Sequence, residues 1–140
     1  MNNRFKFRVW DKITNQYLQE LGIYYWHIPY SLDGEEITGE ANLVGLSELL
    51  KHDNFVTQQY TGLNDSNDNP IYEGDILMYK SGSIPTTGVI GQVLYEADEG
   101  GYIFQWERKG PNQHHINLNC DVAFESVIVG NIFEHSELLK

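Results

Sequence analysis

Apolar and polar residues alternate along residues 5–11, where Phe5, Phe7 and Val9 are separated by basic side chains. This period of two is typical of a half-buried β-strand that presents these three residues on one face. Residues 12–15 then have the composition of a turn. We therefore expect a strand over residues 5–11 that ends in this turn.

A second apolar run, residues 21–28, is rich in aromatic and β-branched side chains. It predicts another strand, which we expect to pair back on the first and to end at Pro29. The polar segment 30–42 predicts an exposed loop. A serine followed by two leucines predicts a short helix over residues 47–52, which must pack on a sheet because helices of this length are marginal alone.

Residues 55–61 again have the pattern of a strand, and a strongly polar turn follows over residues 64–70. Several short β segments with turn signals between them come next. They cover residues 76–79, 88–95, 102–106, 116–124 and 126–133, before one helical turn over 136–140. None is long enough for the crossover helix of a parallel sheet, so this pattern favours a small barrel of antiparallel strands.

The predicted elements describe an α+β chain that is mostly β. We place the boundary between two lobes near residue 60. The expected organisation is a strand-rich α+β lobe over residues 1–60 and a β-barrel lobe over residues 61–140, which ends in a short helical turn.

Composition supports a packed globular chain. The sequence has 140 residues, of which 41% are hydrophobic and 13% aromatic, enough for one domain or two small lobes with a core. The net charge is −11, and residues 58–140 carry four basic against twelve acidic side chains. Because cations supply most of the affinity for phosphate backbones, direct binding of DNA, RNA or anionic lipid is disfavoured.

The compartment follows from the cysteine content. Cys120 is the single cysteine, so no internal disulfide can form, which indicates a reducing environment. The first residues alternate instead of forming the apolar core of a signal peptide, and no apolar run approaches the roughly 18 residues of a membrane span. We expect a cytoplasmic protein with no membrane role.

The turn after residue 64 resembles the start of a calcium loop. Oxygen-bearing side chains occupy alternate positions from Asp65 onward, but the sixth position is Pro70 instead of glycine and the twelfth is Ile76 instead of glutamate. An ordinary turn accounts for the same residues, because aspartate and asparagine tolerate a positive φ. We therefore assign no calcium to it.

A second candidate for a metal site consists of His114, His115, Cys120 and Asp121. Adjacent histidines in a strand point to opposite faces, so only one of them can share a site with Cys120. A small metal-assisted enzyme that uses these histidines, Cys120 and nearby turn carboxylates is therefore the alternative hypothesis. The turn carboxylates are Glu96, Asp98 and Glu99.

Two further groups of residues have simpler interpretations. Gly74 is expected to adopt a backbone angle that other residues resist, and Asp75 is expected to cap the amides that follow it. The aromatic residues Tyr24, Tyr25, Trp26 and Tyr30 exceed what a lobe of about 57 residues can bury. They therefore predict a subunit interface and a homo-oligomer.

Three separated stretches resemble the YopX family of bacteriophage and prophage proteins. They are FRVWD at residues 7–11, QYTGLND at 59–65 with IYEGDI at 71–76, and VGNIFEHSELL at 129–139. The family usually has an Asn-Gly turn between its two halves, where this chain has Asn67 and Asp68. The resemblance nevertheless spans the whole chain.

The resemblance implies an α+β amino-terminal part followed by a β barrel of SH3-like character, in a protein carried by a temperate phage. It transfers no catalytic residue, no cofactor and no metal, since no enzymatic activity is established for the family. Within the similar stretches we assign structural roles to Gly62, Glu73, Gly74, Asp75, Gly130 and Asn131. The predicted function is a non-enzymatic binding or regulatory protein that contacts a host or phage protein, in its sharper form by masking a basic surface.

Overall fold

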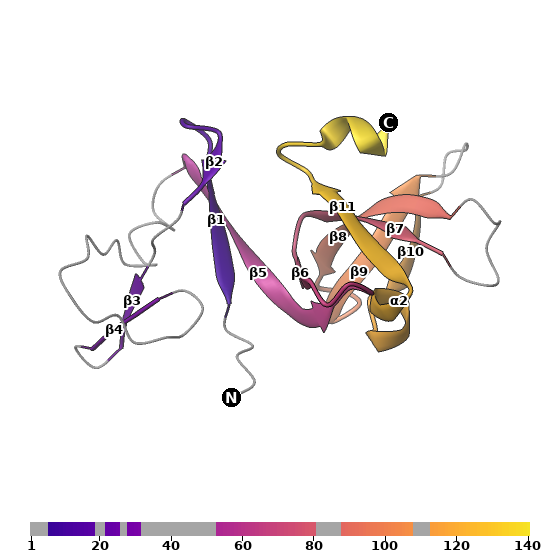
Figure 1. The fold of residues 1–140 in the computed structure, drawn as a ribbon, viewed down its shortest axis with the longest axis horizontal. Helices are drawn as coiled ribbons and strands as arrows, with labels where there is room; N and C mark the ends of the chain where they lie inside the picture. The colour runs from indigo at the N-terminus through magenta and orange to yellow at the C-terminus, as the bar shows by residue number, and fades with distance from the viewer. Residues whose placement is uncertain (1–5, 19–21, 26–27, 32–52, 81–87, 108–112) are drawn as a thin grey trace. The chain divides into compact units, whose positions relative to one another are not determined.

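The computed structural model describes residues 6–18, 22–25, 28–31, 53–80, 88–107 and 113–140. The chain divides into two compact units, Met1–Tyr60 and Thr61–Lys140. The described residues are mostly β, in antiparallel sheets with very little helix (Figure 1).

The larger sheet that begins in the first unit has the strand order β2-β1-β5-β6. Its members are β1 (Phe7–Asp11), β2 (Gln16–Tyr17), β5 (Phe55–Asn64) and β6 (Pro70–Tyr72). The predicted strand is confirmed over residues 7–11, as is the turn after it, while Phe5 lies outside the described residues. Burial does not alternate at the end of β1, where Val9, Trp10 and Asp11 are all buried. Trp10 packs edge-on against the Tyr17 ring at 5.0 Å, which covers the side that the pattern left to solvent.

The second apolar run forms its own hairpin. It consists of β3 (Gly22–Tyr25) and β4 (Ile28–Ser31), which pair with each other. The predicted pairing with the first strand is wrong, because β1 is already flanked by β2 and β5. Pro29 does not end the strand but lies within β4 opposite Tyr24. A two-stranded ribbon allows this, because among the described strands β3 and β4 each pair on one side only.

Several expectations fall on other parts of the chain. The predicted helix over residues 47–52, most of the predicted loop 30–42, and Trp26 lie outside the described residues.

The second unit contains a five-stranded antiparallel sheet with the order β10-β9-β8-β7-β11. Its strands are β7 (Asp75–Tyr79), β8 (Val89–Glu96), β9 (Gly101–Glu107), β10 (Gln113–Asn117) and β11 (Ser126–Asn131). The antiparallel arrangement was predicted, but the sheet curls into a half-barrel (Figure 1). It stays open because β10 and β11 are its two edges and do not pair with each other.

The residues between these two edges form α2 (Cys120–Phe124). The predicted strand over residues 116–124 is therefore wrong beyond Asn117. Asn119 begins the helix by accepting a hydrogen bond from the Val122 N–H at 2.9 Å. The β-branched and apolar residues of this segment predicted a strand. In the structure they form a helical turn, and Val122 and Ala123 lie on its buried side.

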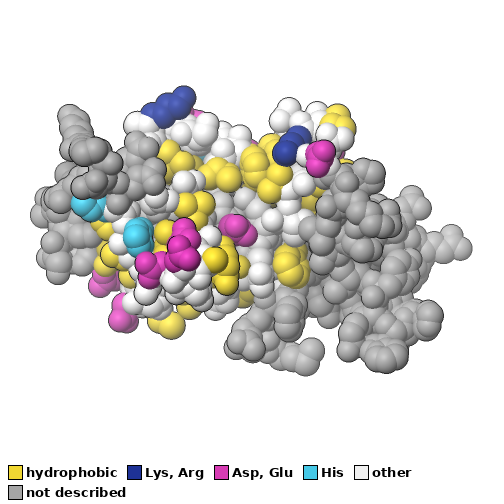
Figure 2. All heavy atoms as spheres, turned by 180° about the vertical axis from the view of Figure 1, so that it is seen from behind, with side chains coloured by type: hydrophobic (Ala, Val, Ile, Leu, Met, Phe, Trp, Pro, Cys, Tyr) yellow, Lys and Arg dark blue, Asp and Glu magenta, His cyan; other side chains and the backbone are white. Residues whose placement is uncertain are grey.

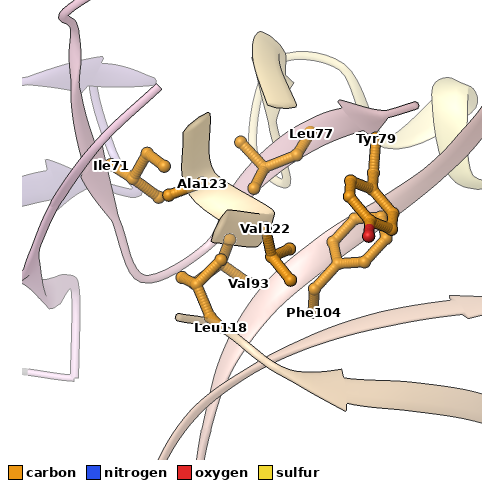
Figure 3. Close-up of a cluster of buried hydrophobic side chains, with 8 residues drawn as sticks. All are labelled: Ile71, Leu77, Tyr79, Val93, Phe104, Leu118, Val122 and Ala123. Atoms are coloured by element: carbon orange, nitrogen blue, oxygen red, sulfur yellow. The ribbon is translucent and has the colours of Figure 1, made fainter. Parts of the chain in front are cut away.

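α2 supplies part of the core of the second unit (Figure 3). Val122 and Ala123 lie among side chains that come from β6, β7, β8 and β9. The buried cluster comprises Ile71, Leu77, Tyr79, Val93, Phe104, Leu118, Val122 and Ala123. The helix therefore packs against the curled sheet as part of the core of the second unit.

The predicted helical turn near residue 136 is confirmed as the 3-10 helix η1 (Ser136–Leu139). Across the part of the chain that the structure describes, no helix is both long and apolar enough to cross a membrane.

Candidate interaction surface on the C-terminal sheet

Asp65 is a buried carboxylate, 4% exposed, in the turn between β5 and β6. Its Oδ1 accepts hydrogen bonds from the backbone N–H groups of Asn67 and Asn69, both at 2.9 Å. Its Oδ2 accepts another from the Ile128 N–H in β11 at 3.0 Å. Both oxygens are thus engaged by the protein, and the residue ties its turn to a strand 63 positions away.

The same turn bears on the calcium interpretation. Asp68 has a φ of +64°, the left-handed conformation that aspartate tolerates in turns. Its carboxylate accepts a hydrogen bond from the Asn64 side chain at 2.8 Å. With the oxygens of Asp65 directed at amides, the turn has the geometry of a hairpin connection.

Gly74 and Asp75 form a second buried motif. Gly74 has a φ of +82°, which a side chain would strain. Asp75 is 1% exposed, and its Oδ2 accepts a hydrogen bond from the Tyr72 N–H at 2.8 Å. The amide in this hydrogen bond precedes Asp75 in the chain. The neighbouring residue Glu73 is half-buried.

Asn131 ends β11 with a third such motif. Its Oδ1 accepts hydrogen bonds from the N–H groups of Phe133 and Glu134, each at 3.0 Å, and its Nδ2 donates to the Glu134 carboxylate at 2.6 Å. Gly130 has no room for a side chain, because an added Cβ would lie 2.7 Å from the His135 side chain. Among the described residues, no buried side-chain nitrogen or oxygen lacks a hydrogen-bond partner.

These motifs coincide with the stretches that carried the family resemblance. Gly62, with a φ of +86°, belongs to the same set. The side chains of Asp65, Asp75 and Asn131 accept hydrogen bonds from backbone N–H groups and thereby hold turns and strand ends in place. They are structural residues by their contacts.

The residues of the metal hypothesis are not gathered into one site. His115 Nε2 lies 3.2 Å from Glu99 Oε1, with both side chains exposed, while His114 stacks on the Trp106 ring at 5.9 Å. Cys120 is exposed at the start of α2. No group of three or more potential ligands forms among the described residues. The alternative hypothesis of a metal-assisted enzyme therefore lacks a ligand cluster in this part of the chain.

The turn between β8 and β9 is an acidic part of the surface. Asp98 and Glu99 are exposed, and Glu96 is half-buried at the end of β8. Figure 2 shows acidic and histidine side chains lying close together on one face of the molecule. The Glu99 carboxylate lies beside β10 through its contact with His115.

Among the described residues, Tyr102 and Asp11 have shifted pKa values. Burial, followed by the charge of Glu73 and then by Tyr95, raises the pKa of the Tyr102 hydroxyl in β9. In the first unit, the hydrogen bond from the Ile13 N–H lowers the pKa of the Asp11 carboxyl. Neither shift points to a catalytic pair, since Asp11 holds its turn and Tyr102 packs against the Tyr95 ring at 5.4 Å.

Among the described residues, β10 is an edge strand of the five-stranded sheet and pairs with β9 alone, which the sequence did not identify. The Leu118 N–H donates to the Tyr102 carbonyl at 2.9 Å. Since ladder bonds alternate along an antiparallel strand, His115 and Asn117 point their backbone groups away from β9. No backbone hydrogen bond from another described residue reaches those groups. No local pattern could have revealed this, because an edge is defined by the order of strands.

Comparison with known proteins agrees with this fold. The crystal structure of protein EF1440 from Enterococcus faecalis is similar, with a TM-score of 0.53 and 21% sequence identity over 96% of this chain and 97% of that chain. At this identity the likeness shows a shared fold. None of the curated proteins matches the sequence. The family described as YopX protein matches residues 6–140, so the chain belongs to the YopX family.

Proposed function

We propose that this chain is a non-enzymatic binding or regulatory protein that acts through protein–protein contacts. The main observation behind the proposal is that the polar side chains of the family motifs bind the protein's own backbone. Asp65, Asp75 and Asn131 are buried and bonded to backbone amides, so they support the fold instead of facing a substrate. What the second unit offers a partner is its outer surface.

The negative charge of that surface indicates the class of partner that we propose. Residues 58–140 have a balance of −8, from twelve acidic and four basic side chains. Such a surface attracts cationic proteins and accelerates their encounter, while it repels phosphate backbones. The partner in this proposal is a basic protein of the host or phage, and masking its nucleic-acid-binding surface is the proposed regulatory effect.

The family membership supports the setting. We place the protein in the cytoplasm of a bacterial host that carries a phage or prophage, and we regard the half-barrel as SH3-like in character. Small sheets of this kind present loops and edges to peptides or subunits.

An affinity experiment tests the proposal. The full chain is immobilised, and lysate from a lysogenic host is passed over it at low and at moderate salt. A basic protein that elutes as salt rises, and binds again when purified, is the expected result. Recovery of no protein partner at either salt concentration would contradict the proposal.

Self-association is a separate part of the proposal. The aromatic residues Tyr24 and Tyr25 of β3 and Tyr30 of β4, together with Trp26, are its proposed contact. The less acidic first part, at −3 over residues 1–57, allows two copies to meet with screened repulsion. Light scattering should show an oligomer that Tyr25→Glu dissociates, and a monomer at all concentrations would contradict it.

A further inference from the structure

The two faces of β10 differ in chemistry. On one face, exposed His115 lies 3.2 Å from Glu99. On the other, Ile116 packs against the buried core and His114 stacks on Trp106. Residues at alternate positions of any strand that pairs with β10 will therefore meet a carboxylate on one face and apolar side chains on the other.

Among the described residues near this edge, the charged side chains are acidic. Glu99 and Asp98 lie in the turn before β9, and exposed Asp121 follows β10 by four residues. Among the described residues of the second unit, the cations are Lys80 and Lys140, and neither belongs to β8, β9 or β10. A second copy of this chain would bring like charges together at the edge, so a cationic segment fits better.

From this geometry we propose that the β10 edge binds an extended, cationic peptide segment as an added antiparallel strand. The inference rests on the proposed function and specifies its surface and the class of partner segment. Backbone groups of His115 and Asn117 supply the hydrogen bonds, and the acidic side chains supply the preference for cations. Antiparallel pairing is the more stable form per residue.

The pairing fixes the pattern of the bound segment. Residues opposite His115 and Asn117 turn their own N–H and C=O groups toward β10, and their side chains lie on the face of Glu99. These positions favour lysine, whose long stem reaches the carboxylate. Residues opposite Ile116 share its apolar face and favour valine or another β-branched residue.

A synthetic peptide of alternating lysine and valine, capped at both ends, is the probe. Isotope-labelled full-length protein is titrated with it, and NMR should show the largest shifts at the amides of His115 and Asn117. A peptide with glutamate in place of lysine should not bind. N-methylation of the lysine amides should abolish binding, whereas N-methylation of the valine amides, which point away from β10, should preserve it.

Matched variants test the protein side. Asn117→Pro removes an outward N–H and should weaken binding at least about tenfold, while Asn117→Ala retains that N–H and should bind like the wild type. Glu99→Gln should weaken binding about two- to fivefold at low salt, with the difference disappearing at high salt. If Asn117→Pro does not fold, the two N-methylated peptides still decide the question.

Four outcomes would overturn the inference. Binding that is insensitive to both Asn117→Pro and N-methylation would show simple charge attraction. If the lysine peptide does not bind, a cationic strand is excluded as the occupant of the β10 edge. A dimer that Asn117→Pro dissociates would identify a second copy of the chain as the occupant. A lysate partner that Asn117→Pro still captures would keep the proposed function while overturning this edge.

Discussion

The two edges of the five-stranded sheet differ in whether other described residues form hydrogen bonds with their outer backbone groups. On the outer side of β11, the Ser126 carbonyl accepts a hydrogen bond from the Ser66 N–H at 2.9 Å, and Asp65 accepts one from Ile128. On the outer side of β10, the backbone groups of His115 and Asn117 meet no described partner of this kind. Exposed edges invite pairing with other chains, so a protein normally covers them.

The residues of the family motifs that form these hydrogen bonds lie near β11. Asp65, Gly74 and Asn131 all act at or near the β11 side: Asp65 bonds to β11, Asn131 ends that strand, and the Gly74 carbonyl accepts a hydrogen bond from the Ile132 N–H at 2.9 Å. One edge is therefore sealed by the residues of the family motifs. The other edge, at which no described strand pairs beyond β10, is where we propose that a partner binds.

Removal of the seal should have the largest effect on stability. Asp65→Ala deletes the acceptor of three backbone N–H groups, and we expect it to lower the free energy of unfolding by about 2–4 kcal/mol. Chemical denaturation measures the change. Asn67→Ala, an exposed side chain in the same turn, should change stability by less than about 0.5 kcal/mol. Equal effects of the two variants would show that the seal contributes nothing.

Proline substitutions should separate the inward and outward amides of β10. Ile116→Pro removes a ladder hydrogen bond to β9 and should destabilise by about 2–3 kcal/mol. Asn117→Pro removes an N–H that points outward and should cost about 1 kcal/mol or less. Thermal or urea unfolding compares them. An Asn117→Pro variant as unstable as Ile116→Pro would mean that the β10 edge is not open.

A methyl group at Gly130 tests how tightly the β11 edge is packed. Gly130→Ala places a Cβ against the His135 side chain, at 2.7 Å before relaxation, and should cost about 1–3 kcal/mol. The matched control is Gly101→Ala in β9, where an added Cβ would meet no atom within 4 Å and should change stability by less than about 0.5 kcal/mol. A stabilised Gly130→Ala variant would contradict close packing.

Hydrogen exchange compares the edges without any substitution. The amides of His115 and Asn117 should exchange at least about tenfold faster than that of Ile116, which bonds to β9. The Ile128 amide also points outward, but its bond to Asp65 should make it slow. Similar rates for Ile128 and Asn117 would remove the distinction between the sealed and the open edge.

The sequence predicted local features well where they depend on neighbouring residues. The turn after β1, the left-handed conformation at Gly74 and the run of short antiparallel strands follow from short-range steric preferences and period-two patterns. It failed at α2, where five residues of strand-like composition form a helix because Asn119 caps them and the core accepts Val122.

Only the tertiary structure decided the order of the strands, and with it which strands lie at the edges of each sheet. The pairing of β3 with β4, the return of β11 beside β7 and the contact of Asp65 with Ile128 join residues by contacts that no local pattern encodes. Many strands of similar composition can pair with one another, and cooperative packing of the whole core selects one order. By itself, the sequence determined that the chain is β-rich, acidic and similar to the YopX family. The structure determined which edge is sealed and which is open, because an edge exists only once every other strand has found its neighbour.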